Sequence, residues 1–140
     1  MAVVKKLLYA DDDLDDRSWF AEACELMNMP ISLTFADNGR SVLQYLSQQK
    51  NEDLPQLIVL DLNMPDVDGR QTLQKLKSSP QWAHIPVAVM STATNQMDSQ
   101  VCDRLGAAVY LTKPATYAAW QKLLQQLMPL LEEAPAGRRQ

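Results

Sequence analysis

The alternation of short apolar runs with longer segments of helical period is the feature that most constrains the fold of this chain. Five apolar runs of strand length occur along the sequence, each followed by a segment whose apolar residues lie three and four positions apart. The expected strands cover 3–10, 31–36, 57–60, 87–90 and 107–111. Because parallel strands need crossover connections, these repeats predict an α/β fold in which a parallel sheet carries helices on both faces.

The apolar positions of the intervening segments predict which helix faces pack on the sheet. Asp13 or Asp15 is the expected cap of the first helix, since aspartate accepts hydrogen bonds from the free amides of a first turn. The third helix begins after Gly69 and the fourth spans roughly 96–105. The expected packing residues are Trp19, Phe20, Ala23, Leu26 and Met27 in the first helix, Val42, Leu43, Tyr45 and Leu46 in the second, Leu73 and Leu76 in the third, and Tyr117, Trp120, Leu123, Leu124 and Leu127 in the last.

The composition is that of one globular domain. The chain has 140 residues, of which 46% are hydrophobic and 21% are charged, enough for a sizeable core and too apolar for general disorder. A net charge of -4 argues against a nucleic-acid-binding protein, which normally presents a basic face. We expect one domain over 1–131 and a loose polar tail over 132–140.

The sequence also predicts a cytoplasmic protein. Its first ten residues contain two lysines within the apolar stretch and do not form a secretory signal, and no apolar run is long enough to span a membrane. Cys24 and Cys102 lie far apart, without metal-binding spacing, and each falls in an expected helix. Buried, reduced thiols fit this pattern and a reducing compartment.

Polar residues follow four of the expected strands. In an open α/β sheet the ligand site lies beyond the carboxyl ends of the strands, so these residues are expected to face one another. They are Asp11, Asp12 and Asp13 after the first strand, Asp61 and Asn63 after the third, Ser91 after the fourth, and Thr112, Lys113 and Pro114 after the fifth. Several carboxylates packed together need a cation to offset their charge, and Mg²⁺ is the usual choice beside phosphate groups.

This set of groups suits phosphoryl transfer. A metal-bound carboxylate beside a lysine can attack a phosphoryl group, while the metal and the ammonium stabilise its oxygens. Ser91 would donate a hydrogen bond to one of those oxygens.

Four segments carry a resemblance to a known family: LLYADDD, LIVLDLNMPDVDG, PVAVMSTA and GAAVYLTKPA. Over roughly residues 5 to 128 the chain resembles the receiver domains of two-component response regulators, specifically the single-domain kind related to phytochrome-associated regulators. The resemblance implies a flavodoxin-like (βα)5 three-layer sandwich whose five-stranded parallel sheet has the order 2-1-3-4-5. The receiver domain would occupy residues 1–131.

The resemblance also implies a role for each site residue. Asp61 would be the phosphoacceptor, and Asp11 and Asp12 would hold Mg²⁺ directly or through water. Asn63 would give the metal its backbone carbonyl, and Asp61 would be a further ligand. Lys113 would pair with the phosphoryl group.

Further residues match the switch and loop positions of the family. Tyr110 would be the aromatic switch residue, swinging inward as Ser91 moves toward the phosphate. The bond between Lys113 and Pro114 would be cis, and Met64-Pro65 and Gly69 match the loop after the acceptor.

The implied function is that of a signalling switch rather than an enzyme. The partners would be a sensor histidine kinase or a histidine phosphotransfer protein, and a second copy of the chain through the face formed by the fourth helix, the fifth strand and the fifth helix. Neither nucleic acid nor membrane is an expected partner. Because the chain ends soon after the last helix, we expect output through binding and not through an attached output domain.

A calcium-binding loop is one alternative for the acidic segment after the first strand. The residues at positions 1, 3, 5 and 12 of that pattern are Asp11, Asp13, Asp15 and Glu22. However, position 6 is Asp16 instead of the glycine that the sharp turn requires, and a strand precedes the segment instead of a helix.

Two other functions remain open. A phosphohydrolase of the haloacid dehalogenase type also uses an aspartyl-phosphate, but it needs an acid at the position of Asn63. A receiver-like adaptor that binds without phosphorylation would have lost the acceptor, an acid or the lysine, and all are present.

His84 is the only histidine and falls in a short loop, which argues against a phosphohistidine carrier. Neither Asn63 nor Ala93 offers an acid to place a hydrolytic water, so we expect a moderate rate of phosphoryl loss.

Overall fold

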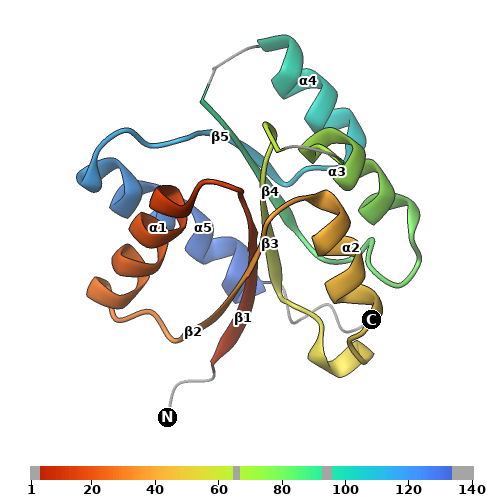
Figure 1. Ribbon diagram of the computed structural model, residues 1–140, viewed down its shortest axis with the longest axis horizontal. Coiled ribbons are helices and arrows are strands. Elements are labelled where there is room, and N and C mark those ends of the chain that lie inside the picture. The colour runs from red at the N-terminus through yellow and green to blue at the C-terminus, as the bar shows by residue number, and fades with distance from the viewer. Residues whose placement is uncertain (1–3, 65–66, 93–95, 134–140) are drawn as a thin grey trace.

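The computed structural model describes residues 4–64, 67–92 and 96–133, which form a sheet between two layers of helices (Figure 1). The five strands are parallel and lie in the order β2-β1-β3-β4-β5, so the expected fold class and strand order are confirmed. In chain order the elements are β1 (Lys5–Ala10), α1 (Leu14–Leu26), β2 (Ile31–Ala36), α2 (Gly39–Ser47), η1 (Asn51–Asp53), β3 (Leu57–Asp61), α3 (Gly69–Ser78), β4 (Val87–Ser91), α4 (Gln96–Leu105), β5 (Val109–Thr112) and α5 (Tyr117–Glu133).

The register of the strands brings their carboxyl ends to one edge of the sheet. Ala10 pairs with Leu60, and Asp61, the next residue of β3, pairs with Met90. Ser91 in turn pairs with Thr112 at the end of β5. The residues that follow β1, β3, β4 and β5 therefore lie together at the carboxyl edge of the sheet, as expected for an α/β fold.

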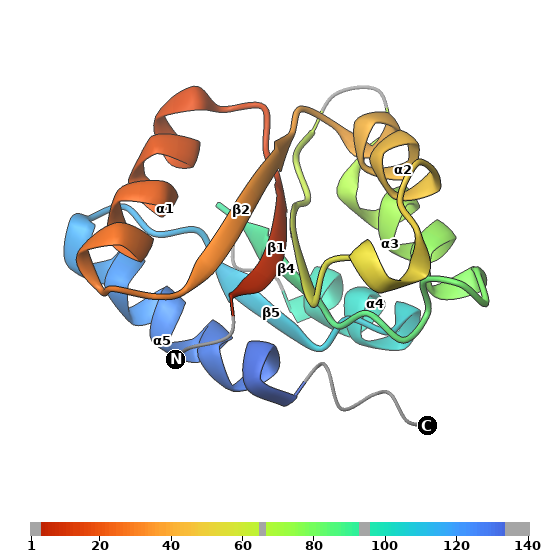
Figure 2. The same ribbon diagram turned by 90° about the horizontal axis from the view of Figure 1, so that it is seen from below.

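Two helical layers cover the sheet, which explains why its central strands are apolar throughout. Helices α1 and α5 lie on one face, and α2, α3 and α4 lie on the other (Figure 2). Every residue of β3 and β4 is buried, as expected for parallel strands covered on both faces.

Each layer closes its own hydrophobic cluster. The α1–α5 cluster contains Leu7 and Tyr9 of β1, alternate residues of β3 and β4, Phe20, Ala23 and Cys24 of α1, and Trp120, Leu123, Leu124, Leu127 and Leu131 of α5. The α2–α4 cluster contains Leu8 and Ala10 of β1, the other residues of β3 and β4, and Val42, Leu46, Leu62, Met64, Leu73, Leu76 and Cys102. The alternation of side chains along a strand separates the two sets.

The packing face of α1 differs from the prediction. Phe20 and Ala23 are fully buried, but Trp19 is 43% exposed and Leu26 is 62% exposed. At 3.6 residues per turn these two side chains lie roughly 100–120° around the helix from Phe20, outside the arc that faces the sheet. Trp19 instead contacts the ring of Tyr117 on α5, with 5.8 Å between ring centroids.

Asp13 caps α1, as one of the two predicted candidates. Its side chain accepts hydrogen bonds from the backbone N–H groups of Asp15, at 2.9 Å, and Asp16, at 3.2 Å. This cap begins the helix directly after the acidic segment and places Asp16 in its first turn.

The remaining elements lie close to their predicted positions. β3 and β4 each extend one residue further, to Asp61 and Ser91, and β5 begins at Val109 instead of 107. Cys24 and Cys102 are buried and form no disulfide, as predicted. Helix α5 continues to Glu133 and so includes the first two residues of the tail predicted over 132–140, and the rest of that tail lies outside the described residues. Within the described ranges, no helix combines the length and apolar character needed to cross a membrane.

Candidate functional site

The carboxyl edge of the sheet brings three carboxylates together. Asp11 and Asp12 follow β1, and Asp61 is the last residue of β3. One oxygen of each lies within 4.8 Å of the others, and among the described residues these three form the acidic group that can hold a metal ion. Asp11 and Asp61 are buried, at 0% and 2% exposure, whereas Asp12 is exposed.

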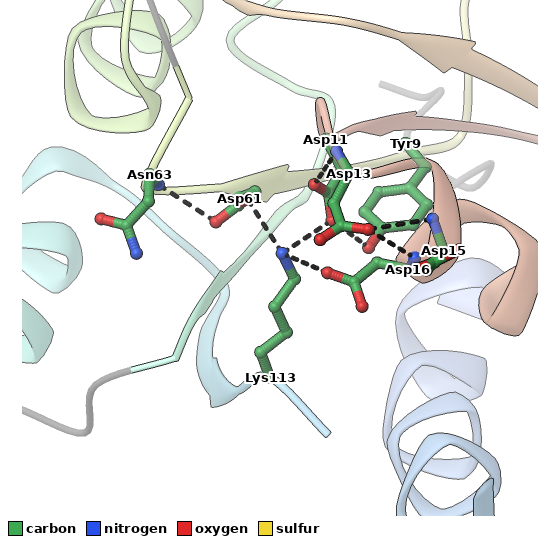
Figure 3. A network of polar contacts seen from close by, with 8 residues as sticks. All are labelled: Tyr9, Asp11, Asp13, Asp15, Asp16, Asp61, Asn63 and Lys113. Carbon is green, nitrogen blue, oxygen red and sulfur yellow. Dashed lines mark hydrogen bonds and ion pairs between the residues drawn. The ribbon is translucent and has the colours of Figure 1, made fainter. Parts of the chain in front are cut away.

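The ammonium of Lys113 lies among these carboxylates (Figure 3). Its Nζ is 2.9 Å from Asp11 Oδ2 and 3.0 Å from Asp61 Oδ2. The third and shortest contact, 2.7 Å, is to Asp16 Oδ2 in the first turn of α1. An ammonium has three protons, so each can be directed to one carboxylate. Burial alone would lower the pKa of Lys113, but its hydrogen bonds to Asp16, Asp11 and Asp61 outweigh burial and raise it.

Asp61 is held from both sides. Its Oδ1 accepts a hydrogen bond from the backbone N–H of Asn63, at 3.0 Å, and its Oδ2 accepts one from Lys113. Burial and the nearby charge of Asp11 raise the pKa of Asp61, while Asn63 and Lys113 act in the opposite direction. The carboxylate is therefore fixed in orientation, in surroundings that stabilise its charge only in part.

Asp11 has three hydrogen-bond donors. The hydroxyl of Tyr9 donates to Oδ2 at 2.6 Å, and the backbone N–H of Asp13 donates to Oδ1 at 2.9 Å. Lys113 completes the set. Burial, followed by the charge of Asp11, raises the pKa of Tyr9, so its phenol keeps its proton and acts as the donor.

The other predicted site residues lie around this centre. Ser91 is buried at the end of β4, and its carbonyl accepts a hydrogen bond from the Lys113 N–H at 2.8 Å. Tyr110 is half-buried on β5 and packs against the α2–α4 cluster. Asn63 is the second residue after β3. The residue before it, Leu62, donates a backbone hydrogen bond to the carbonyl of Met90.

The loop after Asp61 returns to the strand at a glycine. A Cβ on Gly69 would lie 2.7 Å from the carbonyl oxygen of Asp61 and 2.7 Å from the Cα of Leu62. Both are backbone atoms, so only glycine allows α3 to begin this close to Asp61 and Leu62. Pro65 and Ala93, which the sequence also singled out, lie outside the described residues.

One expectation for the site is wrong. The Lys113–Pro114 bond is trans, since none of the peptide bonds in the described residues is cis. Trans is the more stable form before proline by about 0.5–1 kcal/mol. Lys113 makes its three carboxylate contacts from this trans backbone.

The composition of the site fits a hard divalent cation. Asp11 and Asp61 are grouped with Asp12 and also contact Lys113, as does Asp16, so four carboxylates and one ammonium leave an excess of negative charge. Carboxylate oxygens are the ligands that Mg²⁺ and Mn²⁺ prefer. The calcium-loop alternative does not fit, because the Asp13 side chain is engaged as the cap of α1.

Comparison with known proteins agrees with this geometry. The sequence matches the response regulator receiver domain over residues 7–125. The chain belongs to this family. The receiver is 32% identical over 124 residues to the response regulator Rcp1 of Synechocystis sp., covering 86% of this chain and 84% of Rcp1. It is 31% identical over 136 residues to the two-component response regulator ARR5 of Arabidopsis thaliana, covering 91% of this chain and 73% of ARR5.

Solved structures show the same likeness. The phosphorylated cyanobacterial phytochrome response regulator RcpA superposes with a TM-score of 0.83 at 30% identity, covering 93% of this chain and 95% of RcpA. The Mn²⁺-bound form of Rcp1 superposes with a TM-score of 0.78 at 31% identity, covering 88% of this chain and 91% of Rcp1. The chain is thus a receiver domain, a two-component signalling switch homologous to single-domain response regulators, as the sequence predicted.

Two residues of the site were missed by the sequence reasoning. Tyr9 reads as a core position of β1, and Asp16 as one of several acids in a helical first turn. A signal for Tyr9 was available, because a buried tyrosine needs a hydrogen-bond partner and Asp11, two residues on, points to the same side of the strand. No comparable signal identified Asp16, whose contact with Lys113 joins residues from opposite ends of the chain.

Proposed function

We propose that this receiver accepts a phosphoryl group on Asp61 in a Mg²⁺-dependent reaction and thereby switches its binding to partners. The observation that carries the proposal is the triple contact of Lys113. A buried acceptor carboxylate, Asp61, lies 3.0 Å from a buried ammonium, which in turn bridges to the acidic residue Asp11. This arrangement supplies a nucleophile, a fixed positive charge and a metal-binding carboxylate at one point.

Asp11, Asp12 and Asp61 would hold the cation, and the backbone carbonyl of Asn63 would add a further oxygen. The bound Mg²⁺ would neutralise the charge on the transferring phosphoryl oxygens. The grouping of the three carboxylates within 4.8 Å supports this assignment.

In the transfer, an oxygen of Asp61 forms a bond to phosphorus as the bond from phosphorus to the donor breaks. The donor is a phosphohistidine nitrogen of a histidine kinase or phosphotransfer protein, which leaves as a neutral imidazole after taking up a proton. Lys113 then pairs with the phosphoryl oxygens, and Ser91 donates a hydrogen bond to one of them. Both residues lie at the ends of neighbouring strands, joined by the 2.8 Å hydrogen bond between their backbones.

Tyr110 is the residue proposed to report the change. It follows Val109 on β5, is half-buried and packs against the α2–α4 cluster. A shift of Ser91 toward the phosphoryl group would let the Tyr110 ring turn inward. We further propose that a second copy would bind through the α4-β5-α5 face, on which an open groove lined in part by Tyr110, Pro114 and Lys122 lies beside β5 and α5.

The setting of this switch is part of the proposal. Receiver domains of response regulators work with histidine kinases or phosphotransfer proteins, and we propose the same class of partner in the cytoplasm. Because α5 continues to Glu133, the domain would reach two residues beyond the predicted boundary at 131, and the polar tail would begin after this helix.

Intact mass after incubation with acetyl phosphate, with and without Mg²⁺, tests the proposal. We expect one phosphoryl adduct that requires Mg²⁺ and is absent from Asp61→Asn. Asp103→Asn, which makes the same chemical change at an exposed position of α4, should be phosphorylated like the native chain. An adduct on Asp61→Asn, or none on the native chain, would contradict the assignment.

A further inference from the structure

The Asp11 carboxylate has nearly all of its hydrogen-bonding capacity engaged by the protein. Each carboxylate oxygen can accept about two hydrogen bonds or metal contacts. Oδ2 accepts two, from the Tyr9 hydroxyl at 2.6 Å and from Lys113 at 2.9 Å. Oδ1 accepts one, from the Asp13 N–H at 2.9 Å. The remaining position for a cation is therefore on Oδ1.

Tyr9 is a rigid donor. It is fully buried near the carboxyl end of β1, and its ring packs against Phe20 with 4.6 Å between centroids and against Phe35 with 6.1 Å. Because Tyr9 and Asp11 are two residues apart on the same extended segment, their side chains leave the backbone on the same side. The hydroxyl cannot follow a rotation of the carboxylate without repacking of the aromatic cluster.

We propose that the Tyr9 hydroxyl is a positioning group for the divalent-cation site, holding Oδ2 of Asp11 toward the protein so that Oδ1 faces the cation. This inference rests on the proposed function, since it requires a cation held by Asp11, Asp12 and Asp61. Tyr9 itself does not touch the cation or the phosphoryl group. It acts through the orientation of Asp11.

A packing role alone does not account for a tyrosine at this position. Phenylalanine would fill the same space, and a buried hydroxyl is costly unless it is hydrogen-bonded. Here the hydroxyl donates to a carboxylate, which makes a short, charge-assisted bond that fixes the acceptor's direction. Removal of a group that orients a metal ligand in this way typically weakens metal binding by roughly 10- to 100-fold.

Tyr9→Phe is the direct test, because it removes one oxygen and keeps the ring. Titration with Mn²⁺, followed by the electron paramagnetic resonance signal of the free ion, should show Kd about ten-fold higher than in the native chain. The rate of phosphorylation by acetyl phosphate at saturating Mg²⁺ should stay within about two-fold of the native rate, since the variant loses affinity and not the reacting groups.

Two control variants separate positioning from packing. Tyr45→Phe removes a hydroxyl on α2, across the sheet, and Leu124→Ala opens a cavity in the same cluster while keeping the Tyr9 hydroxyl. Both should bind Mn²⁺ within about two-fold of the native chain. If Leu124→Ala weakens binding as much as Tyr9→Phe, or if Tyr9→Phe binds like the native chain, the inference is overturned. If the native chain binds no Mn²⁺, the proposed function fails with it.

Discussion

The two hydrophobic clusters end differently at the carboxyl edge of the sheet. The α1–α5 cluster ends at Tyr9, whose hydroxyl contacts the site, whereas the α2–α4 cluster ends in the apolar side chains of Leu62 and Met64. By strand alternation Asp11 and Asp61 point to the side of Tyr9. One set of alternate strand residues therefore supplies the buried carboxylates of the site, while the other set packs in the α2–α4 cluster and adds Ser91 at the end of β4.

The polar contacts of the α2–α4 layer stabilise its helices and do not contact the site. Arg70 pairs with Asp98 at 2.7 Å and joins α3 to α4, and the Thr72 hydroxyl donates to the Asp68 carbonyl at 2.7 Å within the start of α3. Neither contact reaches the three carboxylates. The comparison indicates that changes to Tyr9 or to the Phe20 ring packed on it affect both stability and metal binding, while changes to the apolar side chains of the α2–α4 cluster affect stability alone.

The largest expected effect comes from removing the positive charge of Lys113 from the site. Lys113→Ala should lower the free energy of unfolding by about 3–5 kcal/mol without Mg²⁺, because it leaves buried carboxylates unpaired. Mg²⁺ should restore part of the loss. Urea unfolding with and without Mg²⁺ measures both, and Lys122→Ala on the exposed side of α5 should change stability by no more than about 0.5 kcal/mol.

A pair of cavity variants tests the comparison itself. Phe20→Ala in the α1–α5 cluster and Leu73→Ala in the α2–α4 cluster should each cost about 2–5 kcal/mol, since both side chains are fully buried. Only Phe20→Ala should also weaken Mn²⁺ binding, because the Tyr9 ring packs on Phe20. Equal losses of metal affinity in the two variants would show that the clusters do not differ in this way.

A smaller loss of stability is expected from a change where α3 begins beside the end of β3. Gly69→Ala should cost about 1–3 kcal/mol and slow phosphorylation, because the added Cβ displaces the backbone of Asp61 and Leu62. Gly106→Ala, before β5, should cost about 1–3 kcal/mol through its φ of 104° yet leave the phosphorylation rate unchanged. Stopped-flow measurement of the phosphorylation rate distinguishes the two variants, whose expected losses of stability are similar.

The smallest effect concerns the two thiols, one in each cluster. Burial raises the pKa of Cys24 to about 11 and also raises that of Cys102. At pH 8 only about one Cys24 in a thousand would then be ionised, so a thiol reagent should react slowly with the native protein and quickly after unfolding. Rapid modification of one cysteine in the native state would show that its cluster opens locally.

The fold was predictable because its signals are local and repeated. The apolar runs and the helical spacing identified the five strands and five α-helices, though not the short η1, and the polar residues at strand ends identified Asp61, Asp11, Asp12 and Lys113 as neighbours. The errors came where tertiary contacts decide. Trp19 and Leu26 were predicted to be buried from their apolar character, but the direction in which α1 faces the sheet leaves both exposed.

The detail of the site was less predictable for the same reason. Asp16 contacts Lys113 only because the cap at Asp13 sets where α1 begins and the β5–α5 connection passes alongside. The cis bond at Pro114 was inferred from resemblance alone, and resemblance does not fix the conformation of a single peptide bond.

The three contacts of the Lys113 ammonium set a simple stoichiometric rule. Its three protons and three carboxylate partners, Asp11, Asp16 and Asp61, already match one for one. An incoming anion can join this lysine only by displacing one of the three. Binding of an anion at Lys113 is therefore coupled to release of Asp11, Asp16 or Asp61 from the lysine.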